Sequence, residues 1–348
     1  MSLTIGLDAM GGDAAPEIVV DGAARALASH SDLAFLMFGD LARVEPLLGR
    51  HEWLRAVTTL RHTPDAVAGD AKPSIALRQG RNSSMRLTIN AVKEGEAAAA
   101  VSAGNTGALM AMAKFVLKTL PGIDRPAIAT VLPGRQRPVV VLDLGANIEC
   151  SAEDLFQFAV MGEVFSRAML GVPKPRVGLL NVGTEELKGG DVVRGAATML
   201  RESRLPIDFH GFVEGTDVTE GVVDVVVTDG FTGNVALKIA EGTAAMFTSA
   251  LRDVIRGGGW RAKFGYLLAR PAFAALRDRF DPRRYNGAMF LGLSGVVVKS
   301  HGGTDAVGFA AAIAVAADLV RKGTNQRIID EMGASGAAAA PVPSAAAS

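Results

Sequence analysis

The chain repeats one pattern: a short apolar segment, a polar or glycine-rich turn, and a longer stretch with helical spacing. The clearest case starts at Val225–Val227, where three β-branched residues precede the turn Thr228–Asn234 and a helical pattern from Val235 onward. An unbroken β-branched run is typical of a strand buried on both faces of a parallel sheet. The same pattern predicts six more strands: Leu3–Leu7, Ala34–Phe38, Ala98–Val101, Val139–Leu142, Val177–Leu180 and Val296–Val298.

Helical stretches separate these strands. We predict helices at Pro16–Ala28, Ser74–Glu94, Ala108–Leu120, Ala152–Leu170 and Ala306–Lys322. Strand, turn and helix in alternation predict an α/β protein with a mostly parallel sheet covered by helices. We therefore assign residues 1–332 to one large catalytic domain. Residues 333–348 are rich in Ala, Ser and Pro and cannot build a core, so we expect a disordered tail there.

Residues 243–284 interrupt this alternation with two amphipathic helical stretches. The first stops at Gly257–Gly259, and the second places large apolar residues on one side: Trp260, Phe264, Leu267 and Leu268. Nine Lys or Arg residues stand against three Asp between Arg252 and Arg284. Such a basic pair could form a dimer interface, a membrane-surface anchor or a dock for an acidic partner. A packed hairpin with a solvated basic face is the plain structural alternative.

Composition limits the functional classes. The 36 basic residues balance the 36 acidic ones, so only a local patch could attract a membrane, and no nucleic-acid partner is expected. The single cysteine, Cys150, excludes a disulfide framework and a thiolate metal cluster, and we interpret it as a small buried residue rather than a nucleophile. The sequence has neither a basic leader nor an apolar run of about 18 residues, which predicts a cytoplasmic protein.

Polar residues collect in the turns that follow the predicted strands. Ligands of open α/β sheets bind beyond the carboxyl ends of the strands, so we expect six of these turns to line one cleft. Backbone N–H groups, Asn amides and Ser/Thr hydroxyls suit a small oxyanion such as phosphate. Neither a Walker motif nor a GxGxxG after the first strand is present, and the five histidines have no zinc-like spacing.

Each polar turn residue also has a structural explanation. Asn105, Asn147 and Asn234 could be turn formers, Asp143 and Asp229 could cap the turns, and Lys238 could be a solvated charge. Six polar turns at one sheet edge favour function collectively. His301, which follows Lys299 and precedes two glycines, is the residue that we most favour as functional.

Six of these turns have distinctive sequences that occur in order along nearly all of Leu3–Val320. They are LDAMGGDAAPE (Leu7–Glu17), SAGNTGALMA (Ser102–Ala111), LDLGANIE (Leu142–Glu149), NVGTEELKG (Asn181–Gly189), VTDGFTGNVALK (Val227–Lys238) and VVKSHGGTDA (Val297–Ala306). Together they resemble the bacterial phosphate acyltransferases, the acyl-acyl-carrier-protein:phosphate transacylases of phospholipid synthesis. One departure is Thr184, where that family often has Glu, which leaves Glu185 and Glu186 as the acids to consider.

The resemblance implies a three-layer α/β/α fold of the phosphate acetyltransferase or isocitrate dehydrogenase type, with a protruding amphipathic helical pair. It also implies a homodimer at the membrane periphery. The reaction needs no metal and no cofactor, and we expect none. The implied reaction moves a long-chain fatty acyl group from acyl carrier protein to inorganic phosphate. The product, an acyl phosphate, would serve phosphatidic acid synthesis by a membrane glycerol-3-phosphate acyltransferase.

The implied chemistry agrees with the residues of the turns. Phosphate is partly dianionic near neutral pH, if its second pKa is roughly 6 to 7, and a thiol leaves readily, with a reference pKa of about 8.5. Neither a strong base nor a strong acid is needed, so positioning and electrostatic stabilisation can supply most of the rate. Direct attack by phosphate on the thioester carbonyl is therefore our hypothesis.

We assign the candidate residues to three sets. The catalytic candidates are His301, Lys299, Asp229, Asn234 and Asp143, of which Lys299 or His301 would stabilise the oxyanion or protonate the thiolate. The phosphate-binding candidates are Ser102, Gly104, Asn105, Thr106, Asn147, Asn181, Gly183, Glu185 and Gly233. The candidates for membrane or carrier-protein contact are Trp260, Arg261, Lys263, Phe264, Leu267 and Leu268.

Three other functions stay open from the sequence. A phosphate acetyltransferase that uses coenzyme A would do the same chemistry on a shorter acyl group. A decarboxylating dehydrogenase of related fold would need a divalent-metal cluster of Asp residues and a dinucleotide site, and neither is evident. A membrane-bound scaffold for lipid enzymes would have no need of a polar cleft.

Overall fold

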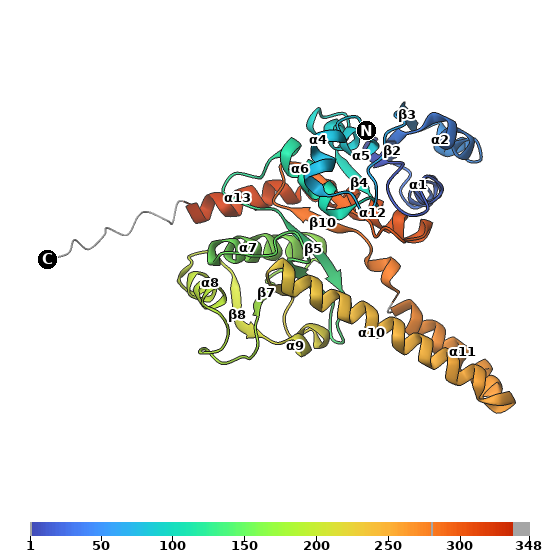
Figure 1. Cartoon of the computed structure of the whole chain (residues 1–348). Helices are drawn as coiled ribbons and strands as arrows, with labels where there is room; N and C mark the ends of the chain where they lie inside the picture. Colours follow the sequence, from blue (N-terminus) through green and yellow to red (C-terminus); the bar gives the residue numbers. More distant parts are fainter. Residues whose placement is uncertain (1, 280, 337–348) are drawn as a thin grey trace.

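A computed structural model describes residues 2–279 and 281–336 and shows a single 11-stranded sheet flanked by helices (Figure 1). The strand order is β3-β2-β1-β4-β11-β10-β5-β6-β9-β7-β8. The strands are β1 (Leu3–Asp8), β2 (Leu33–Gly39), β3 (Thr58–His62), β4 (Ala99–Ser102), β5 (Ala127–Leu132), β6 (Val139–Leu142), β7 (Arg176–Leu180), β8 (Asp208–Val213), β9 (Val225–Val227), β10 (Ala288–Leu291) and β11 (Val296–Lys299).

Both faces of the sheet are buried. Val225 and Val227 of β9 belong to one hydrophobic cluster, whereas Val226 between them belongs to the cluster on the other face. Alternation of this kind follows from the two-residue period of a strand. The predicted α/β class with a mostly parallel, helix-covered sheet is confirmed, and all seven predicted strands are present within one or two residues at each end.

The sequence pattern missed β3, β5, β8 and β10. The edge strand β3 is mostly exposed and carries Arg61 and His62, so it has no apolar run. Strand β10 is antiparallel to both of its neighbours, β11 and β5. It therefore lies outside the strand–turn–helix repeat from which the other strands were predicted.

Central antiparallel pairings divide the sheet into two halves, and the expectation that the polar turns line one cleft stays a prediction. Strands β1, β2, β3, β4 and β11 run parallel to one another. Strand β5 is antiparallel to β6, and β6, β9, β7 and β8 run parallel to one another. The second set therefore runs opposite to the first. The register nevertheless places Val298, near the end of β11, in one row across the sheet with Leu142, the last residue of β6. The loops after the two sets thus leave from the same level of the sheet in opposite directions.

The helices are α1 (Glu17–Ser29), α2 (Leu41–Leu48), α3 (Glu52–Arg55), α4 (Pro73–Gln79), α5 (Ser84–Lys93), α6 (Thr106–Leu117), α7 (Ala152–Met169), α8 (Asp191–Glu202), α9 (Gly215–Glu220), α10 (Gly230–Gly257), α11 (Gly259–Arg279), α12 (Ala306–Arg321) and α13 (Thr324–Gly336), with a 3-10 turn at Pro282–Tyr285. The single helix expected at Ser74–Glu94 is wrong, because α4 and α5 are separate. A new helix starts at Ser83, whose hydroxyl caps α5 by accepting a hydrogen bond from the backbone N–H of Arg86 (3.3 Å).

Helix α10 begins earlier than its sequence pattern predicts. The expected turn through Asn234 is already helical, because Asp229 caps the helix at its amino end. Its carboxylate accepts hydrogen bonds from the backbone N–H of Thr232 (2.8 Å) and from the Thr232 hydroxyl (2.7 Å). The helix then continues without a break through residue 243 to Gly257, and α11 returns beside it as a long protruding pair (Figure 1).

At the carboxyl end, α13 continues to Gly336, so the first four residues of the expected tail are helical. The remaining tail, residues 337–348, lies outside the described residues. Of the helices that the structure describes, none is both long and apolar enough to cross a membrane.

Candidate active site

The first group of loops surrounds a buried carboxylate at the end of β1. Asp8 is 1% exposed and accepts hydrogen bonds from the Ser84 hydroxyl (2.5 Å), the Ser102 hydroxyl (2.6 Å) and the backbone N–H of Met10 (3.3 Å). Burial raises the pKa of Asp8, and these hydrogen bonds oppose the rise. Asp8 thereby holds together β1, β4 and the start of α5.

Ser102 and Gly104, which we predicted to bind phosphate, form hydrogen bonds within this group of loops. The Ser102 hydroxyl donates to Asp8, and its oxygen accepts the backbone N–H of Gly104 (3.0 Å). These polar groups therefore shape the loop after β4 instead of pointing at a ligand. The sequence analysis missed Asp8 itself, although its position at the end of a buried strand, like that of Asp143, was an available signal.

Lys299 lies beside this carboxylate at the end of β11. It is 9% exposed, pairs in register with Ser102, and its ammonium group donates to the carbonyl oxygens of Ala103 (3.3 Å) and Ser300. Burial lowers the pKa of Lys299 to about 8, and repulsion from Lys238 adds to this, whereas the negative charges of Asp8 and Asp13 oppose it. Lys299 is therefore a buried cation whose charge is lost just above neutral pH.

His301 is exposed two residues further on, and its ring orientation is defined. Its Nδ1 accepts the backbone N–H of Gly303 (3.2 Å), and its own backbone N–H donates to Asn286 Oδ1 (2.9 Å). When the ring is neutral, its proton is consequently on Nε2, which can donate to a ligand. Asn286 also donates to the Ser300 hydroxyl (2.8 Å), so it supports the whole loop.

Asn105 and Thr106 complete this group at the start of α6. Asn105 caps the helix by accepting the backbone N–H of Ala108 (2.8 Å), and its amide donates to Gly69 O (2.7 Å). The turn-and-cap explanation of Asn105 therefore holds for its side chain. The positive end of the α6 dipole lies where the Ser102–Asn105 loop meets the helix. Thr106 is exposed in the first turn of this helix.

The second group of loops surrounds Asp143 at the end of β6. Asp143 is fully buried and accepts hydrogen bonds from the backbone N–H groups of Ile128 (3.0 Å), Ala146 (3.0 Å) and Asn147 (2.7 Å), and from the Asn147 amide (2.9 Å). Burial raises its pKa, while the same hydrogen bonds oppose the rise. The Asn147 amide also donates to Pro126 O (2.8 Å), so both predicted residues organise the loop.

Glycines bring the start of α10 against this carboxylate. The backbone N–H of Gly230 donates to Asn147 O (2.7 Å), and a Cβ at Gly233 would lie 1.9 Å from the carbonyl oxygen of Asp143. The predicted residue Gly233 is thus required for close packing of two backbones. Asn234 lies in the same turn and faces Gly145, so Asp143, Asn147, Gly233 and Asn234 are neighbours, with Asp229 capping the helix.

Asn181, Gly183 and Glu185 lie in the loop after β7, which starts beside the end of β9 because the two strands are paired in parallel. The Asn181 amide donates to Lys188 O (3.0 Å), and exposed Glu185 pairs with Lys188 (2.9 Å), which lowers the pKa of Glu185. Among the described residues, no hydrogen bond joins this loop to Asp143 or to Lys299. These three predicted phosphate ligands are tied to their own loop.

Helix α10 links the two main groups. It starts in the Asp143 group, and Lys238, two turns later, is close enough to Lys299 to repel it electrostatically. Lys238 is itself half-exposed and paired with Glu241 (2.7 Å). The candidate site is the Asp8–Lys299–His301 group. The amino-terminal part of α10 connects the Asp143 group to it, because Lys238 of this helix lies near Lys299.

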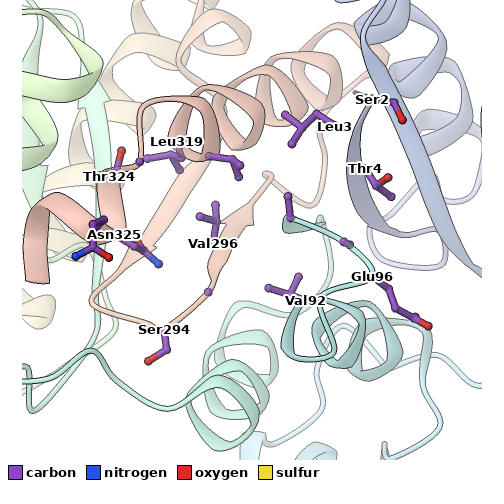
Figure 2. A pocket seen from close by; sticks show the side chains of 17 residues that line it. Ser2, Leu3, Thr4, Val92, Glu96, Ser294, Val296, Leu319, Thr324 and Asn325 are labelled. Atoms are coloured by element: carbon purple, nitrogen blue, oxygen red, sulfur yellow. The ribbon is translucent and has the colours of Figure 1, made fainter.

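Other possible sites in the structure are less suited to catalysis. Cys150 is half-buried, its pKa is raised to about 12, mainly by burial, and its thiol donates to Asn147 O (3.7 Å). No group of three or more His, Cys, Asp or Glu side chains in the described ranges is arranged to hold a metal ion. A hollow of about 530 Å³ lies at the amino ends of β1, β4 and β11 (Figure 2). Glu96 is the only ionisable side chain that lines it, and Glu96 is paired with Arg61.

Comparison with known proteins gives concordant matches over nearly the whole chain. The family model described as "Fatty acid synthesis protein" matches residues 3–327. A phosphate acyltransferase of Rhodospirillum centenum is 63% identical over 328 residues, covering 94% of this chain and 92% of the relative. Another, from Rhodospirillum rubrum, is 60% identical over 331 residues and covers 95% of each chain.

Solved structures show the same fold at low sequence identity. A phosphotransacetylase from Streptococcus pyogenes superposes with a TM-score of 0.62 at 18% identity, covering 92% of this chain and 94% of that one. A branched-chain phosphotransacylase from Enterococcus faecalis gives a TM-score of 0.57 at 14% identity, with coverages of 91% and 99%. The expected phosphate acetyltransferase-type fold is confirmed.

We predict that Asp8→Asn lowers the pKa of Lys299 below its value of about 8, because the substitution removes the negative charge that favours the ammonium form. Titration of ¹³Cε-labelled lysine followed by NMR measures this directly. Asp21→Asn, which removes an exposed carboxylate paired with His51, is the control and should leave the Lys299 titration unchanged. An unchanged titration in a folded Asp8→Asn protein would show that Asp8 and Lys299 are not coupled.

Proposed function

The chain belongs to the fatty acid synthesis protein family together with relatives named phosphate acyltransferases, and on that premise we propose that it transfers a long-chain fatty acyl group from acyl carrier protein to inorganic phosphate. The product is an acyl phosphate, which a membrane glycerol-3-phosphate acyltransferase would consume in phospholipid synthesis. The observation that carries this proposal is that a buried cation, Lys299, and an exposed imidazole, His301, stand two residues apart at the end of β11, next in the sheet to β4, whose loop leads into α6.

The proposed reaction is a direct displacement. A phosphate oxygen attacks the thioester carbonyl carbon, the carbonyl oxygen takes up the electron pair, and the C–S bond then breaks as the C=O bond re-forms. The departing thiolate takes a proton from the medium or from His301. The new bond joins the phosphate oxygen to the carbonyl carbon, so the product is an acyl phosphate, which is a mixed anhydride.

Three features of the first group support this chemistry. The Lys299 ammonium attracts phosphate and lowers the energy of the oxyanion, an effect that is stronger in a dry site than in water. Nε2–H of His301 can donate to the same oxygen. The amino end of α6, with Thr106, adds a favourable dipole for an anion.

The other candidates take supporting roles in this proposal. Ser102 and Gly104 hold the loop through Asp8, so they position phosphate ligands without binding phosphate themselves. Asp143, Asn147 and Asp229 organise the start of α10, which carries Lys238 toward Lys299. Negative carboxylates would repel phosphate, which also favours a positioning role for them.

A phosphate acetyltransferase acting on acetyl-CoA is the alternative, since the structural likeness to phosphotransacetylases concerns the fold alone. The relatives that are about 60% identical are named for the broader acyl transfer and favour neither chain length. The two donors must therefore be compared directly.

The test incubates purified protein with palmitoyl-acyl carrier protein and follows release of the carrier thiol. We expect release only when inorganic phosphate is present, with palmitoyl phosphate formed in equal amount, and a much slower reaction with acetyl-CoA. Rapid turnover of acetyl-CoA without turnover of the carrier substrate would establish the alternative. No turnover of either would leave a non-catalytic scaffold as the explanation.

We predict that the transfer rate falls as pH rises through about 8, because Lys299 loses its proton there and the site loses its buried positive charge. Lys299→Met should reduce kcat/KM by about 10²–10³-fold at pH 7, the typical cost of losing one oxyanion-stabilising group. The pH profile of kcat/KM measures both effects. A descending limb near pH 8 that persists in Lys299→Met would assign that limb to another group.

The helical pair α10–α11 supports a proposal of membrane contact and dimerisation. Apolar side chains of α10 are more than two-fifths exposed at helical spacing: Val235, Ile239, Met246, Phe247 and Val254. Trp260 is 74% exposed at the tip, with Arg261 against its ring (5.6 Å), and Phe264, Leu267 and Leu268 are exposed beyond it. The side chain of Lys263 lies outside the described ones. We assign the α10 face to contact with a second copy and the tip to peripheral membrane binding.

We predict that Trp260→Glu with Leu267→Glu abolishes flotation of the protein with anionic liposomes, because two carboxylates would oppose burial of the tip in the interface. Trp53→Glu is the control, since Trp53 is an exposed tryptophan on α3, outside the helical pair. Equal flotation of the double variant and the wild type would assign membrane contact to another surface.

A further inference from the structure

Helices α4, α5 and α6 carry a cluster of cations with no acidic residue among them. Residues 71–93 and 106–118 contain neither Asp nor Glu. Six of their basic residues form what we call the α4–α6 basic surface: Lys72, Arg78, Arg81, Arg86, Lys114 and Lys118. The three helices lie side by side in the upper half of the molecule (Figure 1).

Contacts around Phe115 show that three of these cations, Arg81, Arg86 and Lys118, are neighbours. Phe115 is 54% exposed, and its ring lies under the guanidinium of Arg86 (5.1 Å) and the ammonium of Lys118 (5.2 Å). The pKa of Arg86 is lowered by partial burial and by repulsion from Arg81. The start of α4 also touches α6, because a Cβ at Gly107 would lie 2.8 Å from Pro73.

None of the six cations forms an ion pair with any described residue. The side chains of Arg78 and Arg86 make hydrogen bonds only within their own helices, to Ser74 O (3.2 Å) and Asn90 Oδ1 (3.2 Å). Elsewhere the pattern differs: Arg61, Arg137 and Arg194 each pair with a carboxylate within 3.0 Å. Six like charges without ion-pair partners on three packed helices form a positive surface in a protein with no net charge.

The α4–α6 basic surface adjoins the candidate active site. Helix α6 starts directly after the Ser102–Asn105 loop, and the Asn105 amide donates to Gly69 O (2.7 Å), three residues before Lys72. An acyl group that is tethered to a carrier by a flexible arm reaches the reacting atoms only from a surface near the site. The position of the cations meets this requirement.

We propose that the α4–α6 basic surface is the docking site of the acidic carrier protein that delivers the acyl thioester. This inference rests on the proposed function and extends it to a defined surface. Complementary charge supplies the recognition, Phe115 and half-exposed Ile75 supply apolar contact, and the cations speed encounter at low salt. The cluster is cationic with few apolar groups, whereas the apolar tip of α10–α11 suits a lipid surface better.

The test uses the double variant Arg81→Glu and Lys114→Glu, two exposed residues outside the catalytic group. The matched control is Arg25→Glu with Arg50→Glu, exposed residues near α1 and α2 that give the same change of net charge. Binding of fluorescently labelled acyl carrier protein is measured by anisotropy at low and at high salt, and turnover is measured with the carrier substrate and with palmitoyl-pantetheine.

We expect the double variant to bind the carrier at least about 10-fold more weakly, which is about 1.4 kcal/mol. Its KM for the carrier substrate should rise similarly, while its rate with palmitoyl-pantetheine stays at the wild-type level. The control pair should bind the carrier within about 2-fold of the wild type, and raised salt should weaken wild-type binding more than that of the double variant.

Three results would overturn the docking site: carrier binding unchanged in the double variant, equal weakening in the control pair, or no carrier binding by the wild type at low salt. Loss of binding to phosphatidylglycerol vesicles with carrier binding retained would assign the surface to a membrane instead. Wild-type carrier binding that depends on Arg81 and Lys114, without phosphate-dependent thiol release, would sustain the docking site and defeat the proposed function.

Discussion

A carboxylate buried at the end of a strand must have hydrogen-bond partners for both of its oxygens, and this constraint organises both loop groups of the protein. Asp8 meets it with two serine hydroxyls and a backbone N–H, and Asp143 meets it with three backbone N–H groups and one amide. An unsatisfied buried acceptor would cost about 1–3 kcal/mol, and more for a charged group. The loops that supply these donors are therefore held in one arrangement.

The same constraint explains why several polar residues near the candidate site are not available to a ligand. Ser102 and Asn147 donate to the two carboxylates, Gly104 donates to the Ser102 hydroxyl, and Asn105 caps α6. The groups that remain to act on a ligand are a smaller set: the buried charge of Lys299, the exposed ring of His301 and the positive end of α6. A site of this kind acts by electrostatics and positioning, which suits an anionic nucleophile and a readily departing thiolate.

Basic residues have three different settings in a chain whose formal net charge is zero. Lys299 is one buried cation with a pKa close to neutral, so its charge is sensitive to Asp8, Asp13 and Lys238. The cations of the α4–α6 basic surface have no ion-pair partners among the described residues, so their positive charge attracts an acidic partner over a longer distance. The α10–α11 pair combines basic and apolar residues on a projecting element (Figure 1). Catalysis, carrier docking and membrane contact are thus assigned to separate elements.

The sequence pattern alone determined those structural elements that depend only on residues close together in the chain. The buried strand β9 and the glycine break between α10 and α11 each depend on a few adjacent residues. The same is true of the α/β class and of the six turns in which the functional residues were sought. The polar edge strand β3 and the antiparallel β10 gave weaker signals and were missed.

Tertiary structure alone decided which of these turns meet. The reversed strands at the centre of the sheet bring the ends of β11 and β6 to one level from opposite directions, and no spacing along the chain encodes that reversal. The partners of Asp8 became known only from the structure, because β4 and α5 bring Ser102 and Ser84 to it across 94 and 76 residues of sequence. Likewise, the cations of α4–α6 are scattered in the sequence and form one surface only because three helices pack together. Local backbone preferences act over a few residues, whereas burial and charge act between any residues that packing brings together.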